Sequence, residues 1–460
     1  MTRLSPLAPY AVLAVMFASV LVFRPLLPID ETRYATVAWE MWVRGDWLLP
    51  TLNFAPYHHK PPVLFWLVNA SWSLFGVHRW AALVPIFLAA AALIWTTKGL
   101  ARRLAPRAAG LLPWLTLSSV PFLVYGTLLM FDVLLTALIA GAYILLWDEA
   151  ERPRAWRPFA LGALIGGALL TKGPVALLFV LPSMALYPLW RGEASLSRFY
   201  LGTGVALLVA LAVVVAWVVP VLAAASDGQF ATWLLWEQTA GRIGGSFGGA
   251  HVRPWWFYLA IAPLLLLPWA LFPAFWRGSR RLPDLRHNAW RFSLCVWAPA
   301  LIAFSVIAGK QPHYILPLLP IVLVEAAVML ERGGMTLATA RRTALAAAAV
   351  FFAAHAVAAP TVLHRYDLSP FAALYAGSAG RPWAFVPNYQ GEIGFLARAH
   401  APLDSVRHRD LPAWFAAHPD GRAIVRYTQP EDVAAFCPLY TQDYRSRHMG
   451  VFAAGGTCAT

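Results

Sequence analysis

The sequence predicts an α-helical polytopic membrane protein with a small mixed α/β domain at its C-terminal end. Three observations predict this class: 60% of the 460 residues are hydrophobic, only 13% are charged, and the mean hydropathy is +0.59. Soluble domains carry about 25% charged residues. Long apolar runs separated by short basic segments account for the difference.

A helix that crosses a bilayer needs roughly 20 predominantly apolar residues. By that measure we expect about 11 transmembrane helices, within a range of roughly 10–13. The first run is too long and too apolar at its end for a cleaved signal peptide, and no small-residue cleavage site follows it. The predicted spans lie near residues 8–27, 79–98, 109–127, 128–147, 158–171, 173–190, 200–223, 255–276, 291–309, 313–331 and 341–360.

Basic residues orient these spans. Segments such as "KGLARRLAPR" and "RGSRRLPDLRHNAWR" follow alternate spans and, with Arg3, hold most of the lysines and arginines between spans. Since short basic loops stay in the cytoplasm, we expect a cytoplasmic N-terminus, outer loops at 28–78 and 224–254, and an outer tail. The net charge of +14 then follows from the basic loops on the cytoplasmic side of the membrane. A nucleic-acid partner is not needed to explain this charge, and none is expected.

The tail, residues 361–460, is less apolar than the membrane domain of residues 1–360 and holds short β-like runs such as "GRAIVRYT". We therefore expect a small α/β domain on the outer side. The chain has three cysteines, Cys295, Cys437 and Cys458, without the spacing of a structural zinc site. In an oxidising compartment Cys437 and Cys458 are predicted to form a disulfide.

The first outer loop opens with two adjacent acids, Asp30 and Glu31. An apolar stripe from Tyr34 to Met41 follows at helical spacing, which predicts a helix lying flat on the membrane. Asp30 either caps that helix or has a chemical function, and the sequence leaves both readings open.

Lysine is rare in this chain: there are four, and Lys60, Lys172 and Lys310 are all predicted at the outer membrane face. Two prolines follow Lys60, and Gly-Pro follows Lys172, so both lysines lie at helix boundaries. Such ammonium groups suit a phosphate at the interface. For Lys60, ordinary snorkelling to the interface is the alternative.

Asp132 lies within an apolar run, "LLMFDVLL", near the outer end of its span. Charged groups in a membrane are costly, which makes this acid a functional candidate, and a salt bridge to a nearby Lys or Arg is the structural alternative. His313 and Tyr314 follow Lys310 at another outer boundary, "AGKQPHYILPLLP".

Histidines offer a possible metal site in the outer loops. The loop at 224–254 has five glycines between Gly241 and Gly249, so it is expected to be mobile, and His251 follows them. His58, His59 and His251 together would suit zinc, because imidazole is a common zinc ligand. Solvated histidines are the alternative.

The stretch "DETRYATVAWEMWVRGDWLLPTLNFAPYHHKPPVLFWL" resembles the first outer loop of the bacterial aminoarabinose transferases of lipid A and of related protein-mannosyltransferase-like glycosyltransferases. "LLTKGPVAL", "FGGAHVRPWWFYL" and "GKQPHYILPLLP" are similar to the same family in the same order. The resemblance covers roughly residues 25–325. It implies the membrane-embedded GT-C fold and transfer of a sugar from a polyprenyl-phosphate carrier, on the outer side of the bacterial inner membrane.

The resemblance also implies roles for individual residues. Asp30 corresponds to the acid of the family's first-loop motif, Asp132 is a second catalytic candidate, and Tyr314 is expected to close over the donor phosphate. The other implied residues are Arg33, Lys60, Lys172 and Lys310 as donor-phosphate ligands and Glu31, Tyr34, Tyr57 and His313 as pocket residues.

One position departs from the family. Aminoarabinose transferases usually carry a glutamate directly before the first-loop lysine, where this chain has His59. In the family that glutamate can share a metal with a histidine of the later loop, which matches His251. We therefore expect one of two explanations. Either His59 and His251 bind a divalent ion, most readily zinc, or the replacement of the glutamate by His59 reflects another sugar or acceptor.

These features predict a glycosyltransferase that moves a sugar from undecaprenyl phosphate to lipid A or another envelope acceptor at the periplasmic face of the inner membrane. Its expected partners are the undecaprenyl-phosphate-linked sugar, a lipid or glycan acceptor and membrane lipids. No nucleotide is expected, since no Gly-rich phosphate loop is present. The alternative is a secondary transporter or flippase of a lipid-linked or envelope precursor, but transporters place ionisable residues near the bilayer midplane.

Overall fold

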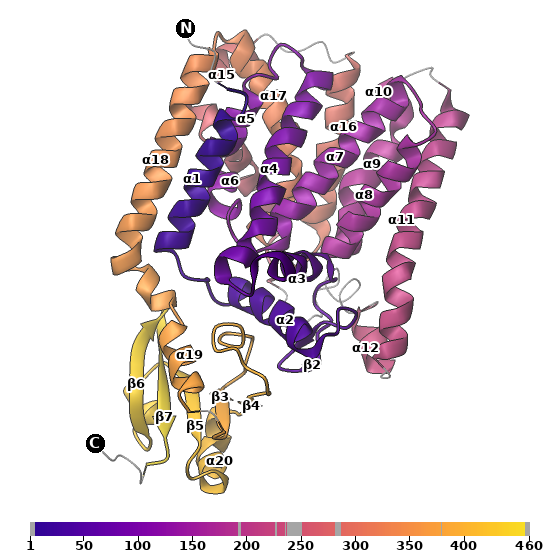
Figure 1. Ribbon diagram of the computed structural model, residues 1–460. Helices are drawn as coiled ribbons and strands as arrows, with labels where there is room; N and C mark the ends of the chain where they lie inside the picture. Colours follow the sequence, from indigo (N-terminus) through magenta and orange to yellow (C-terminus); the bar gives the residue numbers. More distant parts are fainter. Residues whose placement is uncertain are drawn as a thin grey trace. The chain divides into compact units, whose positions relative to one another are not determined.

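The computed structural model describes residues 5–191, 195–225, 228–234, 236, 251–280, 287–378 and 380–455 (Figure 1). The chain divides into two compact units. The helical unit comprises Met1–Ala18 and His58–Phe352, and the sheet unit comprises Ser19–Tyr57 and Ala353–Thr460.

Six helices in the described part of the chain are long and apolar enough to cross a membrane, which agrees with the predicted polytopic class. Each lies over one of the predicted spans. They are α4 (Arg79–Leu104), α7 (Phe131–Glu151), α11 (Leu196–Ala224), α16 (Asn288–Val306), the continuous η5–α17 segment (Pro312–Leu318 and Leu319–Arg332) and α18 (Leu337–Thr361).

The other predicted spans contain shorter or broken helices. Proline and glycine explain several of the breaks, since neither continues an α-helix well. Gly173 has a φ of +80° and is followed by Pro174, which separates two of these segments. The elements in question are α1 (Ala8–Phe23), α5 (Leu112–Ser118), α6 (Val120–Tyr125), α8 (Arg157–Lys172), η1 (Pro174–Ala176), α9 (Leu177–Ala185), α10 (Tyr187–Arg191), α14 (Phe257–Ile261), η3 (Ala262–Leu266) and η4 (Trp269–Leu271).

Within the helical unit, α7 packs against α4 and α8, α8 packs against α11, and α16 packs against α9. Two glycines four residues apart allow the close approach of α8 to α11. A Cβ on Gly162 would lie 2.4 Å from the Ala206 carbonyl oxygen, and one on Gly166 would lie 2.7 Å from the Cβ of Val213. This is the small-residue spacing with which membrane helices bring their backbones together. The remaining helices of the unit are α3 (Val63–Phe75), α12 (Gly228–Thr232) and α15 (Pro273–Ser279).

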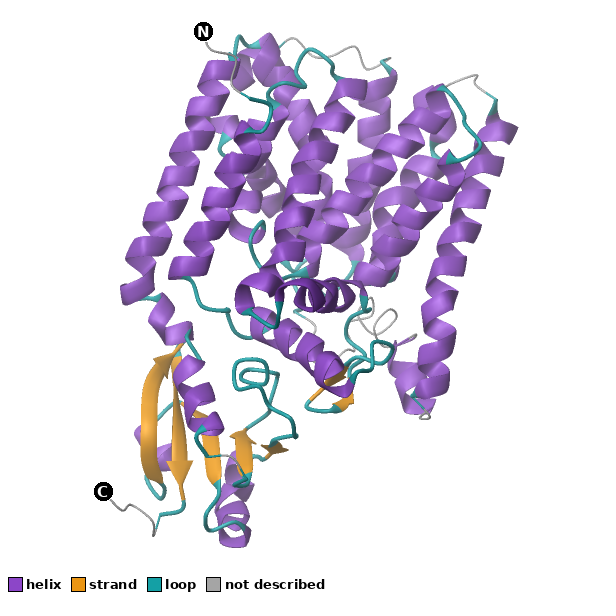
Figure 2. Cartoon of the chain, viewed as in Figure 1, coloured by secondary structure: helices purple, strands orange, loops and turns teal. Residues whose placement is uncertain are grey.

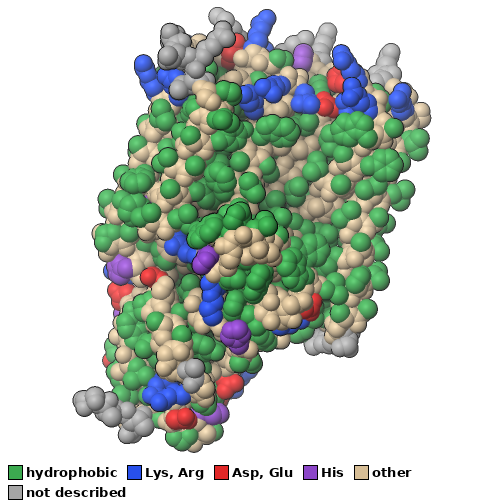
Figure 3. Space-filling view, viewed as in Figure 1, with side chains coloured by type: hydrophobic (Ala, Val, Ile, Leu, Met, Phe, Trp, Pro, Cys, Tyr) green, Lys and Arg blue, Asp and Glu red, His purple; other side chains and the backbone are tan. Residues whose placement is uncertain are grey.

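Charge is distributed unevenly over the helical unit. Lys and Arg side chains gather at the end that carries the N-terminus, while apolar side chains cover the flanks (Figure 3). Ion pairs hold part of this basic end together: Arg103 Nε lies 2.5 Å from Asp148, and Arg191 Nη1 lies 2.7 Å from Glu151. An apolar girdle with one basic end is the pattern expected of membrane helices.

The sheet unit contains a five-stranded sheet in the order β4-β3-β5-β7-β6 (Figure 2). β3 is parallel to both β4 and β5, and β7 is antiparallel to β5 and β6. The strands are β3 (Trp383–Val386), β4 (Asp404–Ser405), β5 (Arg422–Tyr427), β6 (Cys437–Tyr444) and β7 (Arg447–Ala453). The small mixed C-terminal fold predicted from the sequence is therefore present.

Both faces of this sheet are covered. Phe385 points to a core that includes residues of α19, whereas its neighbours Ala384 and Val386 point to a second core that includes residues of α20. This alternation follows from the two-residue period of a strand. The helical elements of the tail are η6 (Leu363–Tyr366), α19 (Ser369–Ala376), η7 (His408–Asp410), α20 (Leu411–Ala417) and η8 (Pro430–Val433).

The sheet unit also takes in part of the first outer loop. The helix α2 (Asp30–Arg44) and a hairpin of β1 (Thr51–Leu52) and β2 (Ala55–Pro56) belong to it. The predicted domain boundary lay at residues 360 and 361, so the compact unit is larger than that domain. The stripe from Tyr34 to Met41, predicted to face lipid, is buried instead.

Candidate functional site

An ion pair of the helical unit joins two helix ends. Asp132 is the second residue of α7, and Lys172 is the last residue of α8. The Lys172 ammonium donates a hydrogen bond to Asp132 Oδ1, and both side chains are less than a tenth exposed. A carboxylate at a helix N-terminus and an ammonium at a helix C-terminus each sit favourably in the helix dipole, so the two helix ends stabilise the pair that joins them.

Aromatic side chains surround this pair. The Lys172 ammonium lies 4.8 Å from the ring centroid of Tyr314, in cation–π geometry. The His313 ring lies 4.9 Å from that of Tyr314 and 5.6 Å from that of Tyr125. His313 and Lys60 lie near enough to the Asp132 carboxylate to interact with it electrostatically. We call Lys60, Asp132, Lys172, His313 and Tyr314 the polar cluster.

The position of Lys172 follows from the local sequence. Gly173 adopts a left-handed φ of +80° and Pro174 starts a 3₁₀ turn, so α8 ends at the lysine. An L-residue is strained at such a φ. Tyr314 is placed in the same way, because η5 begins at Pro312. Helix-breaking residues therefore place Lys172 and Tyr314 at helix ends within an apolar bundle.

Lys310 has a different environment from the one the sequence suggested. It is 2% exposed, and its ammonium donates to the carbonyl oxygens of Arg253, at 3.0 Å, and Ile307. The backbones of the two segments pair here: Lys310 N donates to His251 O at 2.9 Å, and Arg253 N donates to Ala308 O at 3.2 Å. Burial lowers the pKa of the Lys310 amino group. In this structure Lys310 therefore fastens two loop segments together.

In the sheet unit, the adjacent acids of the first outer loop separate into two roles. Glu31 is buried, pairs with Arg24 at 3.1 Å and accepts a hydrogen bond from Leu27 N at 2.9 Å. Asp30 is exposed and accepts a hydrogen bond from the Tyr34 hydroxyl at 3.4 Å. The N-cap position of α2 is Ile29, and no side chain caps the helix. Capping therefore does not account for Asp30.

Arg33 lies one helical turn from Asp30 and is half-buried. Its Nε donates to the Gln390 carbonyl oxygen at 3.2 Å, and its Nη2 donates to Gln390 Oε1 at 2.9 Å. Tyr57, the other predicted pocket residue of this unit, is buried, and its backbone N donates to Pro50 O at 2.8 Å.

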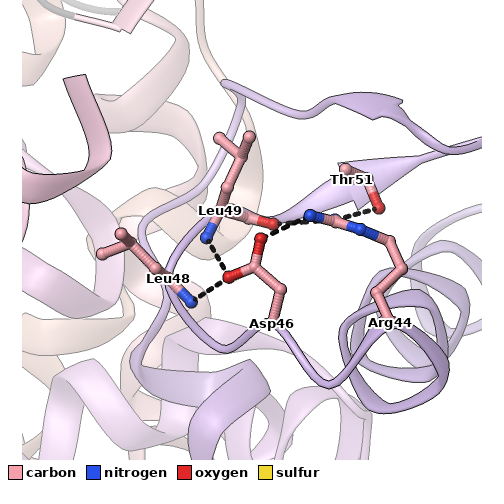
Figure 4. A network of polar contacts seen from close by, with 5 residues as sticks. All are labelled: Arg44, Asp46, Leu48, Leu49 and Thr51. Carbon is pink, nitrogen blue, oxygen red and sulfur yellow. Dashed lines mark hydrogen bonds and ion pairs between the residues drawn. The ribbon is translucent and has the colours of Figure 1, made fainter. Parts of the chain in front are cut away.

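A polar network fixes the turn that follows α2 (Figure 4). Gly45 ends the helix in a left-handed conformation with a φ of +63°. Arg44 then pairs with Asp46 and donates to Leu49 O at 3.1 Å and to Thr51 Oγ1 at 3.0 Å. The Asp46 carboxylate accepts from the backbone N of Leu48, at 2.8 Å, and of Leu49. This network sets the path of the chain from α2 into β1.

His58, His59 and His251, the histidines predicted as metal ligands, all lie among the described residues. No group of three or more His, Cys, Asp or Glu side chains in the described ranges could hold a metal ion. The His58 ring lies 4.5 Å from that of His59 and 4.7 Å from that of Trp233. The glycine-rich segment 241–249 lies outside the described residues, as does Cys458, the predicted partner of Cys437.

The structure thus brings together Asp132, Lys172, His313 and Tyr314 in the helical unit, with Lys60 close enough to act electrostatically. In the sheet unit it places Asp30, Tyr34 and Arg33 along α2. Gln390 was missed by sequence reasoning, because an isolated glutamine in a polar tail carries no signal. Tyr125 was missed for a similar reason, since a lone tyrosine in an apolar run is ordinary.

The chain is similar in sequence to known proteins. Residues 59–219 match the family described as dolichyl-phosphate-mannose-protein mannosyltransferase. The undecaprenyl phosphate-alpha-4-amino-4-deoxy-L-arabinose arabinosyl transferases of Pseudomonas fluorescens and Sodalis glossinidius are 31% and 32% identical over 313 and 341 residues. These alignments cover 64% and 71% of this chain, and 52% and 60% of the relatives. The chain thus spans little more than half the length of the curated relatives it matches.

The fold is shared over a longer region. The crystal structure of ArnT from Cupriavidus metallidurans bound to undecaprenyl phosphate superposes with a TM-score of 0.81 and 20% identity, covering 98% of each chain. By sequence the chain is similar to these arabinosyl transferases and, over residues 59–219, to the dolichyl-phosphate-mannose-protein mannosyltransferase family. Over almost its whole length it has the fold of ArnT.

Proposed function

We propose that this protein is a glycosyltransferase that moves a sugar from undecaprenyl phosphate to lipid A or another envelope acceptor. The observation that carries the proposal is the polar cluster, in which lysines, an acid, a histidine and a tyrosine meet at helix ends of an apolar bundle. A lipid-linked phosphate needs this arrangement, because its tail stays in hydrocarbon while its charge requires positive partners at the interface.

The reaction breaks the bond between the sugar C1 and the phosphate oxygen and forms a bond between C1 and an acceptor oxygen. Undecaprenyl phosphate leaves with the electron pair of the broken bond. Arg33 and Lys60 would stabilise the negative charge that grows on the leaving phosphate. Asp30, exposed and not used as a cap, would accept the proton of an acceptor hydroxyl or orient an acceptor group that is already ionised.

The remaining residues support this chemistry. Lys172 is held in place by Asp132 and faces Tyr314, so the three would form a pre-arranged wall of the donor pocket. Lys310 would keep the segment at His251 attached beside this pocket through its bonds to backbone carbonyls.

We further propose about 11 transmembrane segments in the bacterial inner membrane, with the N-terminus in the cytoplasm and the sheet unit in the periplasm. The six long helices count toward that number, and the shorter apolar helices would complete it. The one-sided distribution of Lys and Arg supports the orientation (Figure 3).

Mass spectrometry of carrier lipids, lipid A and glycans from cells with and without the gene tests the function. The proposal expects a modified acceptor only in cells with the gene, and a carrier-linked sugar that accumulates without it. A flippase or transporter is the second candidate function because broken helices suit one. A flippase would move the lipid-linked sugar intact, so purified protein would leave the sugar–phosphate bond unbroken.

A further inference from the structure

Within the sheet unit, the tail segment Gln390–His400 contacts α2. Trp39 Nε1 donates to Ala399 O at 2.8 Å. Thr36 Oγ1 donates to Gly391 O at 2.9 Å and accepts from Phe395 N at 3.0 Å. These bonds lie on the side of α2 that also carries Arg33, so the segment follows the helix for about two turns.

The approach of the two backbones is unusually close beside Arg33. Gly391 has a φ of +85°, and a Cβ there would lie 3.0 Å from the Cα of Arg33 and 2.9 Å from a methyl of Leu52. Only glycine fits this conformation and this space without displacement. The residue before it, Gln390, is thereby held against the Arg33 guanidinium.

A second set of contacts anchors Gln390 to the sheet. The Glu392 Oε2 atom accepts a hydrogen bond from Gln390 N at 2.6 Å, and Glu392 Oε1 lies 3.7 Å from Arg426 Nη1. Glu392 is fully buried, and Arg426 is in β5. The segment leaves the carboxyl end of β3, which lies between two parallel neighbours, where α/β sheets commonly place functional loops.

We propose that Gln390 is a positioning residue for Arg33 in donor binding, an inference that rests on the proposed function. Its two acceptors take two of the five N–H donors of the guanidinium and fix its plane. The Arg33 guanidinium makes no other hydrogen bond among the described residues, so its remaining N–H donors are left for a phosphate. Within the sheet unit, Arg426, Glu392 and Gln390 would thus act on donor binding through Arg33.

Binding of undecaprenyl phosphate to the full-length protein in lipid nanodiscs tests the inference. Arg33→Ala is expected to weaken binding by about tenfold to hundredfold, and Gln390→Ala by about five- to tenfold. The double variant is expected to bind no more weakly than Arg33→Ala alone, because Gln390 acts through Arg33. Gln390→Glu should weaken binding at least as much as Gln390→Ala, since its carboxylate would compete with the phosphate for the guanidinium.

Gln442→Ala is the matched control. Gln442 lies in β6 of the same sheet and contacts Tyr440 and the Asp367 carbonyl oxygen, so donor affinity should stay unchanged. Wild-type affinity in Gln390→Ala, together with weakened binding in Arg33→Ala, would overturn the role of Gln390. So would additive losses in the double variant, which would indicate a general effect on folding. Wild-type affinity in Arg33→Ala would instead overturn the phosphate site of the proposed function.

Discussion

Lys172 and Asp132 form a buried ion pair between the C-terminal end of one helix and the N-terminal end of another. The two residues are 40 positions apart in sequence, and each was singled out separately as a charge in an apolar setting. Their pairing makes each the counter-charge of the other. The sequence had left a salt bridge open as the structural alternative for Asp132, and the structure contains that bridge.

Breaking this pair should destabilise the helical unit. Asp132→Asn or Lys172→Met leaves one buried charge without a partner, which costs roughly 3–5 kcal/mol. The double variant should be more stable than the sum of the single losses predicts, because both charges are removed. Thermal unfolding of the four proteins in detergent measures this coupling.

Arg365→Ala serves as the control, since Arg365 and Asp443 form an exposed pair at 3.7 Å and such pairs contribute about 0–1 kcal/mol. If Asp132→Asn unfolds at the same temperature as this control, the buried pair does not stabilise the fold.

The adjacent acids at the start of α2 should respond differently to loss of charge. Asp30→Asn is expected to abolish transfer while leaving the unfolding temperature unchanged, since Asp30 is exposed and caps nothing. Glu31→Gln is expected to lower the unfolding temperature, because it removes the partner of buried Arg24. Turnover and thermal unfolding of both variants give the comparison. Near-normal turnover in Asp30→Asn would rule out the role assigned to that carboxylate.

Lys60→Ala is expected to weaken binding of the polyprenyl-phosphate donor by about tenfold to hundredfold, because a charge-assisted contact contributes roughly 1.5–3 kcal/mol. Isothermal titration with undecaprenyl phosphate measures the loss. Lys98→Ala is the matched control, since Lys98 belongs to the basic segment "KGLARRLAPR". If Lys60→Ala and Lys98→Ala bind undecaprenyl phosphate with equal affinity, Lys60 is not a donor ligand.

Glu392 should make the stability of the sheet unit depend on pH. Burial raises the pKa of its carboxyl above the ordinary value of 4.5, although the Gln390 N–H and Arg426 oppose the shift. Because the pKa of Glu392 is higher in the folded protein than in the unfolded chain, its carboxyl contributes fully to the free energy of unfolding below about pH 4.5. This contribution is lost as the pH rises through the pKa of the folded protein. The free energy of unfolding should therefore fall over that window.

Glu392→Gln removes this titration and keeps an acceptor for Gln390 N. Hydrogen-exchange mass spectrometry of peptides from β3 and β5, corrected for the intrinsic rate at each pH, compares the two proteins. The wild type should lose more protection than the variant as pH rises from about 4.5. Parallel pH profiles would show that Glu392 does not titrate in this range.

The orientation of the chain can be tested with fusions. A C-terminal alkaline phosphatase fusion should be active and a fluorescent-protein fusion dark, because the basic end of the helical unit is expected in the cytoplasm. The same fusions placed after Arg107, in a basic segment, should behave in the opposite way. An inactive phosphatase fusion at the C-terminus would indicate that the sheet unit lies in the cytoplasm.

Sequence reasoning succeeded where the signal is local. Apolar runs located all six long helices, because burial in lipid requires a continuous apolar stretch. Gly-Pro after Lys172 predicted the helix end that presents this lysine. The β-like run "GRAIVRYT" predicted the strand β5.

It could not show partners that come from distant parts of the chain. Lys310 is predicted from the sequence as a phosphate ligand, and its bonds to the backbone carbonyls of Arg253 and Ile307 depend on tertiary packing, which no local pattern shows. The bonds from Arg33 to Gln390 join residues 357 positions apart, so no local pattern could have shown them. For the same reason the tail was predicted as a separate domain, although α2 belongs to its compact unit.

The most direct test of the account is turnover by the purified protein. Carrier-linked sugars and envelope lipids extracted from the native cells are reconstituted with wild type or Asp30→Asn in lipid vesicles, and mass spectrometry follows both groups of lipids. The account predicts that wild type releases undecaprenyl phosphate and adds one sugar to the acceptor, while Asp30→Asn does neither. Intact carrier-linked sugar with wild type would contradict the proposed glycosyl transfer.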